Sequence, residues 1–481
     1  MRKIGAASVK TGDRWTARLV VALMLGAVSA AETTTLDSAP KTWAAQWIAR
    51  ADGPARDFDV VYFRKTVSVA AVPARVVVDV SADTRFELHV NGKRVGMGPA
   101  LADVHHWRYE TFDLAPYLHA GKNTVAAVVW NFGTGAAIAQ LSSQTAFLLS
   151  AEDSANSSIN TGDGWMASQE PGRTPGETDV KGYYAAGPSE VMDGNRMIWD
   201  WDKASGSGRW SAAKLLGRAA PRGARDSPTR WILEKNGLPQ MQYEAVSAGH
   251  VVRLSGMPAG ASLEKAVTVP AHSSATFLLD RNELVTAYPS LELEGGKGAS
   301  VELTYAEALY DAKGGKGNRN EVDDRHIEGL SDHIVSDGER RSYRTLWWRT
   351  WRYLQVDVKT GDAPLTIDGL SAFYTAYPFS AVGRFASNDA ELSRIWDVGW
   401  RTAQLCAHET YMDTPYWEQL QYVGDTRIQA LISYGVTGDD RLAQQAMRAY
   451  RDSLLTDGLT QSRYPSSLTQ VIPPLGYSRG W

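Results

Sequence analysis

The hydrophobic pattern of this chain changes its period once, near Phe385, and this change limits which elements the chain can form. Before it, β-branched and aromatic residues gather in short runs with strand character, such as residues 61–67, 85–90 and 351–358. After it, residues 387–389 offer side chains suited to a helix N-cap, and apolar residues then recur at helical spacing. The sequence therefore predicts a long all-β part followed by consecutive antiparallel helices.

The all-β part is predicted to form two antiparallel β-sandwich domains, at residues 41–230 and 231–385. In the first, Asn91 and Gly92 stand between two strand-like runs, which is the signal of a two-residue hairpin turn. Its last third is rich in Gly, Ser and Pro and is expected to form long loops. The helices are predicted to occupy residues 386–481.

The N-terminus has the features of a signal peptide over residues 1–30. Arg2 and other basic residues precede the apolar run 19–27, and Val28 and Ala30 supply small residues for a cleavage site. The apolar run is shorter than the roughly 20 residues that a membrane-spanning helix needs. We therefore expect cleavage near Ala30 or Ala31, a periplasmic or secreted protein, and no membrane span.

Composition agrees with an exported globular protein and excludes several functions. The 481 residues are 43% hydrophobic and 22% charged, and the net charge of −4 gives no basic surface for nucleic acid. The single cysteine, Cys406, cannot form an internal disulfide and is predicted to be a buried structural thiol. We predict no cofactor and no metal, because the acidic stretch 314–325 lacks the residue order of a calcium loop. The sequence leaves the oligomeric state open.

The segment DTPYWEQLQYVGD sets three carboxylates close together, at Asp413, Glu418 and Asp425. Thr414 followed by Pro415 has the form of an N-cap and a first helical residue, so we expect a helix that begins here. Asp413 would then lie just outside the start of this helix. Seven residues, about two turns, separate Glu418 from Asp425, which would place both carboxylates on one helix face.

Aromatic residues accompany these carboxylates at Tyr416, Trp417 and Tyr422. Acids and rings together suit a sugar, because carboxylates accept hydrogen bonds from hydroxyls and rings pack against the C–H face. Cleavage of a glycosidic bond also needs a carboxylic acid that protonates the leaving oxygen. The alternative interpretation is a capped helix with an acidic first turn, which the helix dipole favours.

The motif and the segment before it, SNDAELSRIWDVGWRTAQLCAHETYM, resemble the start of the catalytic domain of bacterial α-L-rhamnosidases. The first β domain is similar to galactose-binding-like jelly rolls, and the second to the sandwich that precedes the catalytic domain in this family. The resemblance implies an inverting glycoside hydrolase with a six-hairpin (α/α)6 barrel, of which this chain would contain the first helices. It implies that Glu418 is the general acid, and that Asp413 and Asp425 bind sugar hydroxyls. Trp417 and Tyr422 would line the same site, and the partner would be a glycan or glycoside with a terminal α-L-rhamnosyl unit.

The chain departs from the family pattern near its C-terminus. Residues 462–474 still fit, whereas residues 475–481 do not, and a six-hairpin barrel needs more than the three or so helices expected here. The general base of the family lies further along the barrel, so no residue of this chain is assigned to it. We therefore expect a C-terminally truncated chain without hydrolytic activity. Two alternatives stay open: a non-catalytic carbohydrate-binding protein, and a six-hairpin glycosidase that acts on another sugar.

Overall fold

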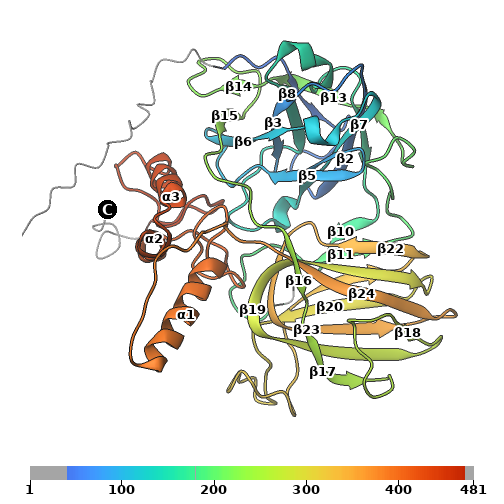
Figure 1. Cartoon of the computed structure of the whole chain (residues 1–481). Coiled ribbons are helices and arrows are strands. Elements are labelled where there is room, and N and C mark those ends of the chain that lie inside the picture. Colours follow the sequence, from blue (N-terminus) through green and yellow to red (C-terminus); the bar gives the residue numbers. More distant parts are fainter. Residues whose placement is uncertain (1–40, 179, 472–481) are drawn as a thin grey trace, which may run out of the picture. The chain divides into compact units, whose positions relative to one another are not determined.

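Strands occupy the described chain from Gln46 to Tyr374, and the α-helices follow, as the change in hydrophobic period predicts. The structure is a computed structural model that describes residues 41–178 and 180–471 (Figure 1). The predicted signal peptide therefore lies outside the described residues. Among the residues that are described, no helix has the length and apolar character needed to cross a membrane.

Two sheets enclose the core of the first sandwich in the described part of the chain. One sheet has the strand order β13 (Lys214–Arg218), β1 (Gln46–Ala49), β8 (Ala146–Ala151), β3 (Val77–Asp83), β6 (Trp107–Asp113), β15 (Ile232–Lys235) and β14 (Ala220–Pro221). The other has the order β12 (Ser211–Ala212), β9 (Met166–Gln169), β2 (Asp59–Val69), β7 (Gly121–Asn131), β4 (Arg85–Val90) and β5 (Lys93–Gly98). Phe63 from one sheet and Phe147 from the other stack in the buried cluster between them.

Connections in this sandwich follow the turn signals of the sequence. Asn91 and Gly92 both have positive φ, at 52° and 77°, and join the paired strands β4 and β5. This confirms the predicted hairpin, because a type I′ turn requires positive φ at both central residues. The 3₁₀ helices among the described residues are η1 (Ala115–Tyr117), η2 (Gly133–Gly135) and η3 (Ser154–Ile159).

The second sandwich is built from one sheet that bends back on itself. Its described strands follow the order β10 (Arg173–Pro175), β11 (Glu190–Asp193), β21 (Leu330–Val335), β20 (Ser300–Ala306), β23 (Arg349–Lys359), β19 (Ser274–Gly295), β24 (Leu365–Tyr374) and β16 (Glu244–Ser247). β17 (His250–Ser255) and β22 (Gly338–Arg344) also pair with β19, and β18 (Val267–Val269) pairs with β24. β19 is the long curved strand of Figure 1. Its pairing with β23 is interrupted between Asp280 and Val285. β17 pairs with the half of β19 before this break, whereas β22 and β24 pair with the half after it.

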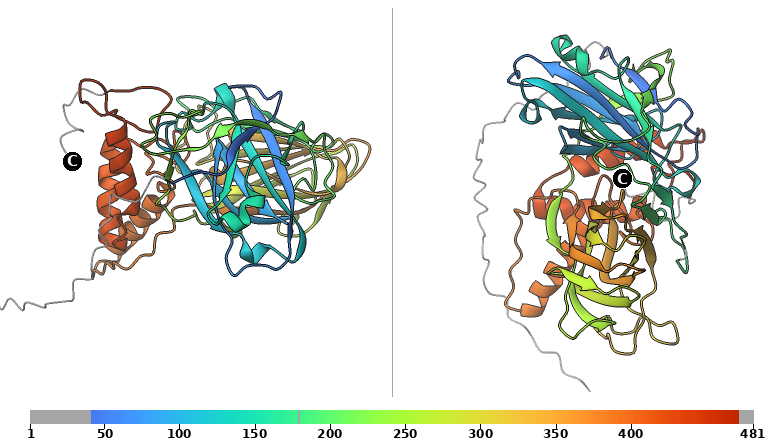
Figure 2. Two further views of the ribbon diagram at one scale, coloured as in Figure 1. Left: turned by 90° about the horizontal axis from the view of Figure 1, so that it is seen from above. Right: turned by 90° about the vertical axis from the view of Figure 1, so that its right-hand side faces the viewer.

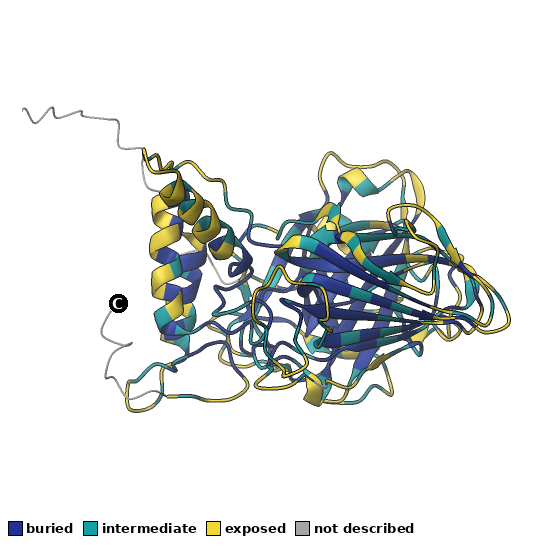
Figure 3. Ribbon diagram, turned by 90° about the horizontal axis from the view of Figure 1, so that it is seen from below, coloured by how far each residue is buried: buried dark blue, intermediate teal, exposed yellow. Residues whose placement is uncertain are grey.

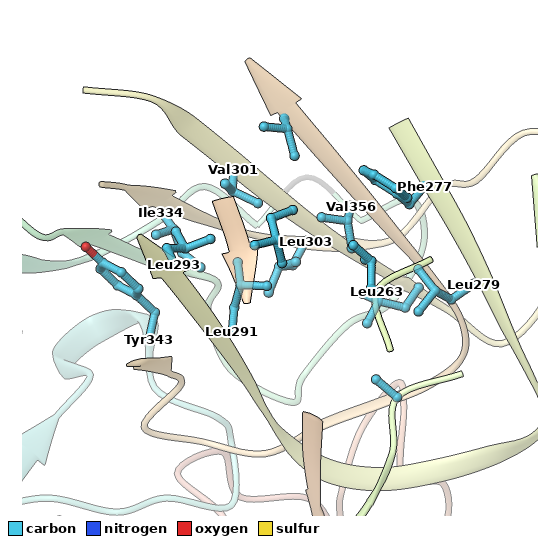
Figure 4. Packing of buried hydrophobic residues seen from close by; sticks show 14 of the residues in the cluster. Leu263, Phe277, Leu279, Leu291, Leu293, Val301, Leu303, Ile334, Tyr343 and Val356 are labelled. Atoms are coloured by element: carbon cyan, nitrogen blue, oxygen red, sulfur yellow. The ribbon is translucent and has the colours of Figure 1, made fainter. Parts of the chain in front are cut away.

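Buried apolar side chains fill the space inside this bent sheet (Figure 4). On β20, Val301 and Leu303 lie in this core, whereas Glu302 between them is partly exposed. This alternation is typical of an antiparallel sheet with one face on the core and one face in water. The outer face of β20 and its neighbours is therefore polar.

Strand pairing does not follow the domain boundary expected at residue 230. β10 and β11 precede that boundary but belong to the second sheet, where β11 pairs in parallel with β21. β15 follows the boundary but belongs to the first sandwich, where it pairs in parallel with β6. A hydrophobic pattern records strand character but not the partner of a strand, so this exchange could not be predicted.

Three α-helices follow the strands in the described residues: α1 (Ala390–Leu405), α2 (Val423–Thr437) and α3 (Arg441–Asp452) (Figure 2). The Asp389 carboxylate caps α1 by accepting from Glu391 N at 2.9 Å, as the sequence predicts. α2 ends at Gly438, whose left-handed φ of 70° is typical of a C-terminal cap. α2 and α3 share a buried cluster in which Ala430 and Leu442 pack. The helices also present exposed surfaces, drawn in yellow in Figure 3.

Candidate active site

The carboxylate motif forms a tight loop, so the prediction of a helix beginning at Thr414 is wrong. α2 begins only at Val423. Asp413 N donates to Leu420 O at 2.9 Å, and Leu420 N donates to the Asp413 carboxylate at 3.1 Å. These two hydrogen bonds close the loop between the two residues.

Tertiary hydrogen bonds explain why the loop is preferred over a helix. The carbonyl of Pro415, which a helix would use internally, accepts from the Thr350 hydroxyl at 2.8 Å and from Gln419 Nε2 at 3.0 Å. Gln419 has a left-handed φ of 56°, and its side-chain oxygen accepts from the Trp347 indole at 2.9 Å. The second sandwich therefore holds the loop in a conformation that the local sequence does not specify.

The loop brings the three predicted carboxylates together, although not on one helix face. Asp425 lies exposed in the first turn of α2, whereas Glu418 lies in the loop before the helix. Burial raises the pKa of Asp413 to about 7; hydrogen bonds from backbone N–H groups oppose this, and the nearby charges of Glu418 and Asp425 add to it. The site therefore contains one carboxyl group that exchanges its proton near neutral pH.

A chain of hydrogen bonds leads away from Glu418. The Tyr422 hydroxyl donates to Glu418 Oε2 at 2.8 Å, and Arg463 donates to the oxygens of Tyr422 at 2.9 Å and Tyr183 at 3.0 Å. Burial and the bond to Glu418 raise the pKa of Tyr422 to about 12, so the phenol keeps its proton. This series of hydrogen bonds thus fixes one oxygen of Glu418.

Arg463 and Tyr183 were not predicted from the sequence as site residues. Arg463 comes from the segment after α3, and Tyr183 comes from the loop between β10 and β11. The available signal for Arg463 was that residues 462–474 fit the family pattern. Nothing in the sequence around Tyr183 pointed to this contact.

Trp417 is turned toward the second sandwich. Its indole N–H donates to Glu307 Oε2 at 2.9 Å, and its carbonyl accepts from Ala185 N at 2.7 Å. The Lys316 ammonium lies 5.0 Å from the centre of its ring. Of the two predicted aromatic site residues, Tyr422 therefore contacts Glu418, whereas Trp417 lines a hollow of the second sandwich.

A buried ion pair anchors the segment that leads into the motif. The Arg85 guanidinium on β4 donates to both oxygens of Glu409, at 2.6 and 2.5 Å. Leu101 N also donates to Glu409, at 3.1 Å. The ion pair therefore joins the first sandwich to the chain between α1 and the loop.

The thiol of Cys406 is buried as predicted, next to this segment. Burial raises its pKa to about 12, and the charges of Asp413 and Asp425 add to this effect. A protonated, buried thiol is a poor nucleophile. The chemistry that the site offers is that of the carboxylates, the phenol and the guanidinium.

These groups suit a polyhydroxylated ligand and a proton transfer to it. Carboxylates accept hydrogen bonds from hydroxyls, and a fixed carboxyl group can deliver a proton. In the part of the chain that the structure describes, no three His, Cys, Asp or Glu side chains are grouped so that they could hold a metal ion.

Two family models match the sequence. The α-L-rhamnosidase N-terminal domain matches residues 71–230, and the bacterial α-L-rhamnosidase 6 hairpin glycosidase domain matches residues 380–480. The second match continues past residue 474, so the expected departure from the family pattern at residues 475–481 is wrong. No curated protein matches the chain in a sequence search.

Solved structures share the fold at low sequence identity. The GH78 family rhamnosidase of Bacillus sp. GL1 has a TM-score of 0.76 at 16% identity, over 90% of this chain and 65% of its own. The α-L-rhamnosidase from Dictyoglumus thermophilum has a TM-score of 0.65 at 16% identity, over 88% of this chain and 46% of its own. The Streptomyces avermitilis α-L-rhamnosidase complexed with L-rhamnose has a TM-score of 0.61 at 17% identity, over 85% of this chain and 38% of its own. This chain thus spans less than two thirds of the length of each of these structures.

The shared fold confirms the predicted fold class: two β-sandwiches followed by helices of a six-hairpin domain. The two domain models match residues 71–230 of the β part and residues 380–480 of the helical part with domains of one family. On this evidence, the chain belongs to the bacterial α-L-rhamnosidase family.

Proposed function

We propose that this chain belongs to an exported glycoside hydrolase that cleaves terminal α-L-rhamnosyl linkages with inversion. The observation that carries the proposal is the grouping of Glu418, Asp413 and Asp425 on the family motif, close enough for the charges of the other two to raise the pKa of Asp413. Carboxylates grouped in this way favour a ligand rich in hydroxyls. The matched domain models make rhamnose the first sugar to test.

In the proposed mechanism Glu418, in its protonated form, donates a proton to the glycosidic oxygen as the bond to the sugar breaks. The Tyr422 hydroxyl, 2.8 Å from Glu418 Oε2, holds the carboxyl group in one orientation, and Arg463 holds Tyr422 in turn. Asp413 and Asp425 accept hydrogen bonds from the sugar hydroxyls. Inversion also needs a second carboxylate about 6.5–9.5 Å away across a water molecule, and we assign no residue to that role.

Export rests on the sequence of residues 1–30. The domain boundary near residue 385 is likewise proposed from the sequence, whereas strands are exchanged across the boundary expected at residue 230. The export proposal predicts that the mature protein begins near Ala30 or Ala31. N-terminal sequencing of the protein recovered from the periplasm or the medium tests this. An uncleaved Met1 in that fraction would contradict it.

Direct binding tests the sugar site without requiring turnover. We expect L-rhamnose to bind the full chain, and L-fucose and D-mannose to bind it more weakly. Asp413→Ala and Asp425→Ala should each weaken binding about tenfold, because a hydrogen bond to a charged group contributes about 1.5–3 kcal/mol. Titration calorimetry or ligand-observed NMR measures these dissociation constants.

The controls separate the site from unspecific effects and from the two alternatives. Glu418→Gln keeps the shape of the acid and should retain binding. Asp397→Ala, an exposed change on α1, should have no effect. Equal affinity for all three sugars would contradict rhamnose specificity and favour a six-hairpin glycosidase for another sugar. Rhamnose binding that is insensitive to both aspartates would remove the motif from the binding site and favour a non-catalytic sugar-binding protein.

A further inference from the structure

A hollow of about 430 Å³ lies on the outer face of the second sandwich. It is referred to below as the sheet hollow. Its floor is formed by side chains of three neighbouring strands, and Tyr310, Trp417 and the segment around Glu328 stand around it. Its volume is within the range of about 300–1,000 Å³ that is typical of small-molecule sites.

The floor of the sheet hollow is an ordered set of hydroxyl, amide and carboxylate groups. The hydroxyls of Thr304 and Ser331 are 2.7 Å apart across β20 and β21. On β23, Gln355 Nε2 donates to Asp357 Oδ2 at 2.7 Å, and the Thr276 hydroxyl donates to Asp357 Oδ1 at 2.6 Å. The outer face of an antiparallel sheet is often polar simply because it meets water. Here, however, Tyr310, Trp417 and Glu328 surround that face, so the polar groups lie at the bottom of a hollow.

Two aromatic side chains of the wall are held in place by one lysine. The Lys316 ammonium lies 5.0 Å from the centre of the Trp417 ring and 5.5 Å from the centre of the Tyr310 ring. It also forms an ion pair with Glu307 at 3.3 Å, and Glu307 accepts the indole N–H of Trp417. The wall is therefore fixed before any ligand arrives, which reduces the entropy cost of binding.

Charge narrows the class of ligand. The lining residues contribute three carboxylates, from Glu302, Glu328 and Asp357, against the ammonium of Lys181. Lys181 forms an ion pair with Glu328 at 2.9 Å. An anionic ligand would be repelled, whereas hydroxyl groups find both donors and acceptors on the floor.

Two segments connect the sheet hollow with the carboxylate site. Trp417 lines the hollow and is followed directly by Glu418. Lys181 lines the hollow two residues before Tyr183, which accepts the hydrogen bond from Arg463. Neighbouring residues on these two segments therefore link the hollow to the hydrogen bonds around Glu418.

We propose that the sheet hollow is a second saccharide subsite, which binds neutral sugar units linked to the residue held by the carboxylates. This inference rests on the proposed function, because it takes Glu418 and its neighbouring aspartates as the site of the terminal sugar. It gives the chain a preference for neutral oligosaccharides over monosaccharides and over acidic glycans.

The test compares ligands that fill one subsite or both, with the full chain carrying Glu418→Gln so that no turnover consumes the ligand. The probes are L-rhamnose, a neutral trisaccharide with a terminal α-L-rhamnosyl unit, and an oligogalacturonate of the same length. Ser331→Tyr places a ring in the hollow, and Thr268→Tyr places the same ring on the exposed face of β18 in the same sheet. Aromatic residues are well tolerated in strands, so both variants should fold. Asp357→Asn, which keeps the shape of the floor, is the second variant.

We expect the trisaccharide to bind about tenfold more tightly than L-rhamnose, equivalent to about 1.4 kcal/mol. Ser331→Tyr should remove this gain and Asp357→Asn should reduce it. Both should leave the affinity for L-rhamnose unchanged, and Thr268→Tyr should change neither value.

Three results would overturn the subsite. The first is equal affinity for L-rhamnose and the trisaccharide. The second is a higher affinity for the trisaccharide that persists in both Ser331→Tyr and Asp357→Asn. The third is tighter binding of the oligogalacturonate than of the trisaccharide. If the trisaccharide binds in a manner sensitive to Ser331→Tyr while L-rhamnose does not bind at all, the proposed function fails and the subsite stands. If neither ligand binds, both proposals fail.

Discussion

At the scale of single residues, the fold changes the acid–base behaviour of Asp413. Burial and the charges of Glu418 and Asp425 bring its pKa to about 7. The folded chain therefore prefers this carboxyl group protonated over a pH range in which the unfolded chain ionises it. That preference makes the stability of the fold depend on pH through one residue.

Asp413→Asn should stabilise the protein at alkaline pH and not at acid pH. Because the pKa of Asp413 is raised in the folded state, its proton contributes stability to the fold. This stabilisation is fully present below about pH 4 and is lost as the pH rises through about 7. We expect the variant to be more stable than the parent chain by about 1–2 kcal/mol at pH 8, after allowance for screening by solvent. At pH 4 the two should be equal. Urea denaturation at both pH values measures this, with Asp397→Asn on the exposed face of α1 as control. A difference that is the same at both pH values would contradict the raised pKa.

Binding of the sugar should show the opposite dependence on pH. An ionised carboxylate is the stronger acceptor for a sugar hydroxyl, so affinity for L-rhamnose should rise as Asp413 loses its proton near pH 7. Titrations at about pH 6 and about pH 8 measure the change, which should disappear in Asp413→Asn. An unchanged pH dependence in that variant would assign the titration to another group.

At the scale of elements, the buried pair Arg85–Glu409 holds β4 and the segment after α1 together. Both side chains are almost fully buried, and both Glu409 oxygens are engaged. Removing one partner of such a pair leaves a buried charge without compensation. The joint between the first sandwich and the motif loop therefore depends on both residues.

Glu409→Gln should destabilise the protein by about 3–5 kcal/mol. Asp200→Asn, which breaks the exposed pair with Lys203, should cost less than about 1 kcal/mol and serves as control. The double variant Arg85→Met, Glu409→Leu should recover much of the loss, because no charge is then left buried. Urea denaturation followed by fluorescence measures all three. If Glu409→Gln costs no more than the exposed control, the ion pair does not hold the joint.

α1 differs from α3 in how little of it is buried. Leu392, Ile395 and Val398 on α1 are 45%, 60% and 65% exposed, and its buried residues are Ala403 and Leu405 near its end. α3 buries five residues over a shorter length. Since the stability of a helix in a protein comes mainly from packing, α1 should open more easily.

Hydrogen exchange should therefore be at least about tenfold faster for amides in the first two thirds of α1 than in the middle of α3. Exchange followed by mass spectrometry measures this at two protein concentrations. Equal protection at both concentrations would contradict the prediction. Protection of α1 only at the higher concentration would show that a second copy covers its apolar face.

Prediction from the sequence succeeded where local pattern decides the element and failed where distant contacts do. The strand-like run at residues 351–358, which forms β23, and the Asp389 cap of α1 carry their own signals. Thr414 and Pro415 carry the signal of a helix start, but Thr350 and Gln419 take up the Pro415 carbonyl, and the loop results. The exchange of β15 between domains has the same origin, because pairing partners are chosen in three dimensions.

At the scale of the whole molecule, the site is assembled from parts of the chain that are far apart in sequence. Glu418 comes from the motif loop, Arg463 from the segment after α3, and Tyr183 from the loop between β10 and β11. The spacing of acids in one segment predicts the grouping of Asp413, Glu418 and Asp425, and their roles in the site stay a prediction. The residues that orient Glu418 could not be predicted, since no local pattern links them to the motif.

The expectation that this chain lacks hydrolytic activity stays a prediction, and an aryl α-L-rhamnoside tests it. A proton donor alone does not invert a glycosidic bond, because a second carboxylate must activate the water on the opposite face of the sugar. Asp413 and Asp425 are assigned to the sugar hydroxyls, and no other described residue is assigned as that base. We therefore expect no turnover above that of Glu418→Gln, even at concentrations at which L-rhamnose binds. If the chain does turn over, and Glu418→Gln lowers kcat by about 10²–10⁴-fold, the base lies within this chain and the prediction is wrong. NMR of the first-formed sugar would then decide the stereochemistry, since an inverting enzyme releases the β-anomer from an α-rhamnoside.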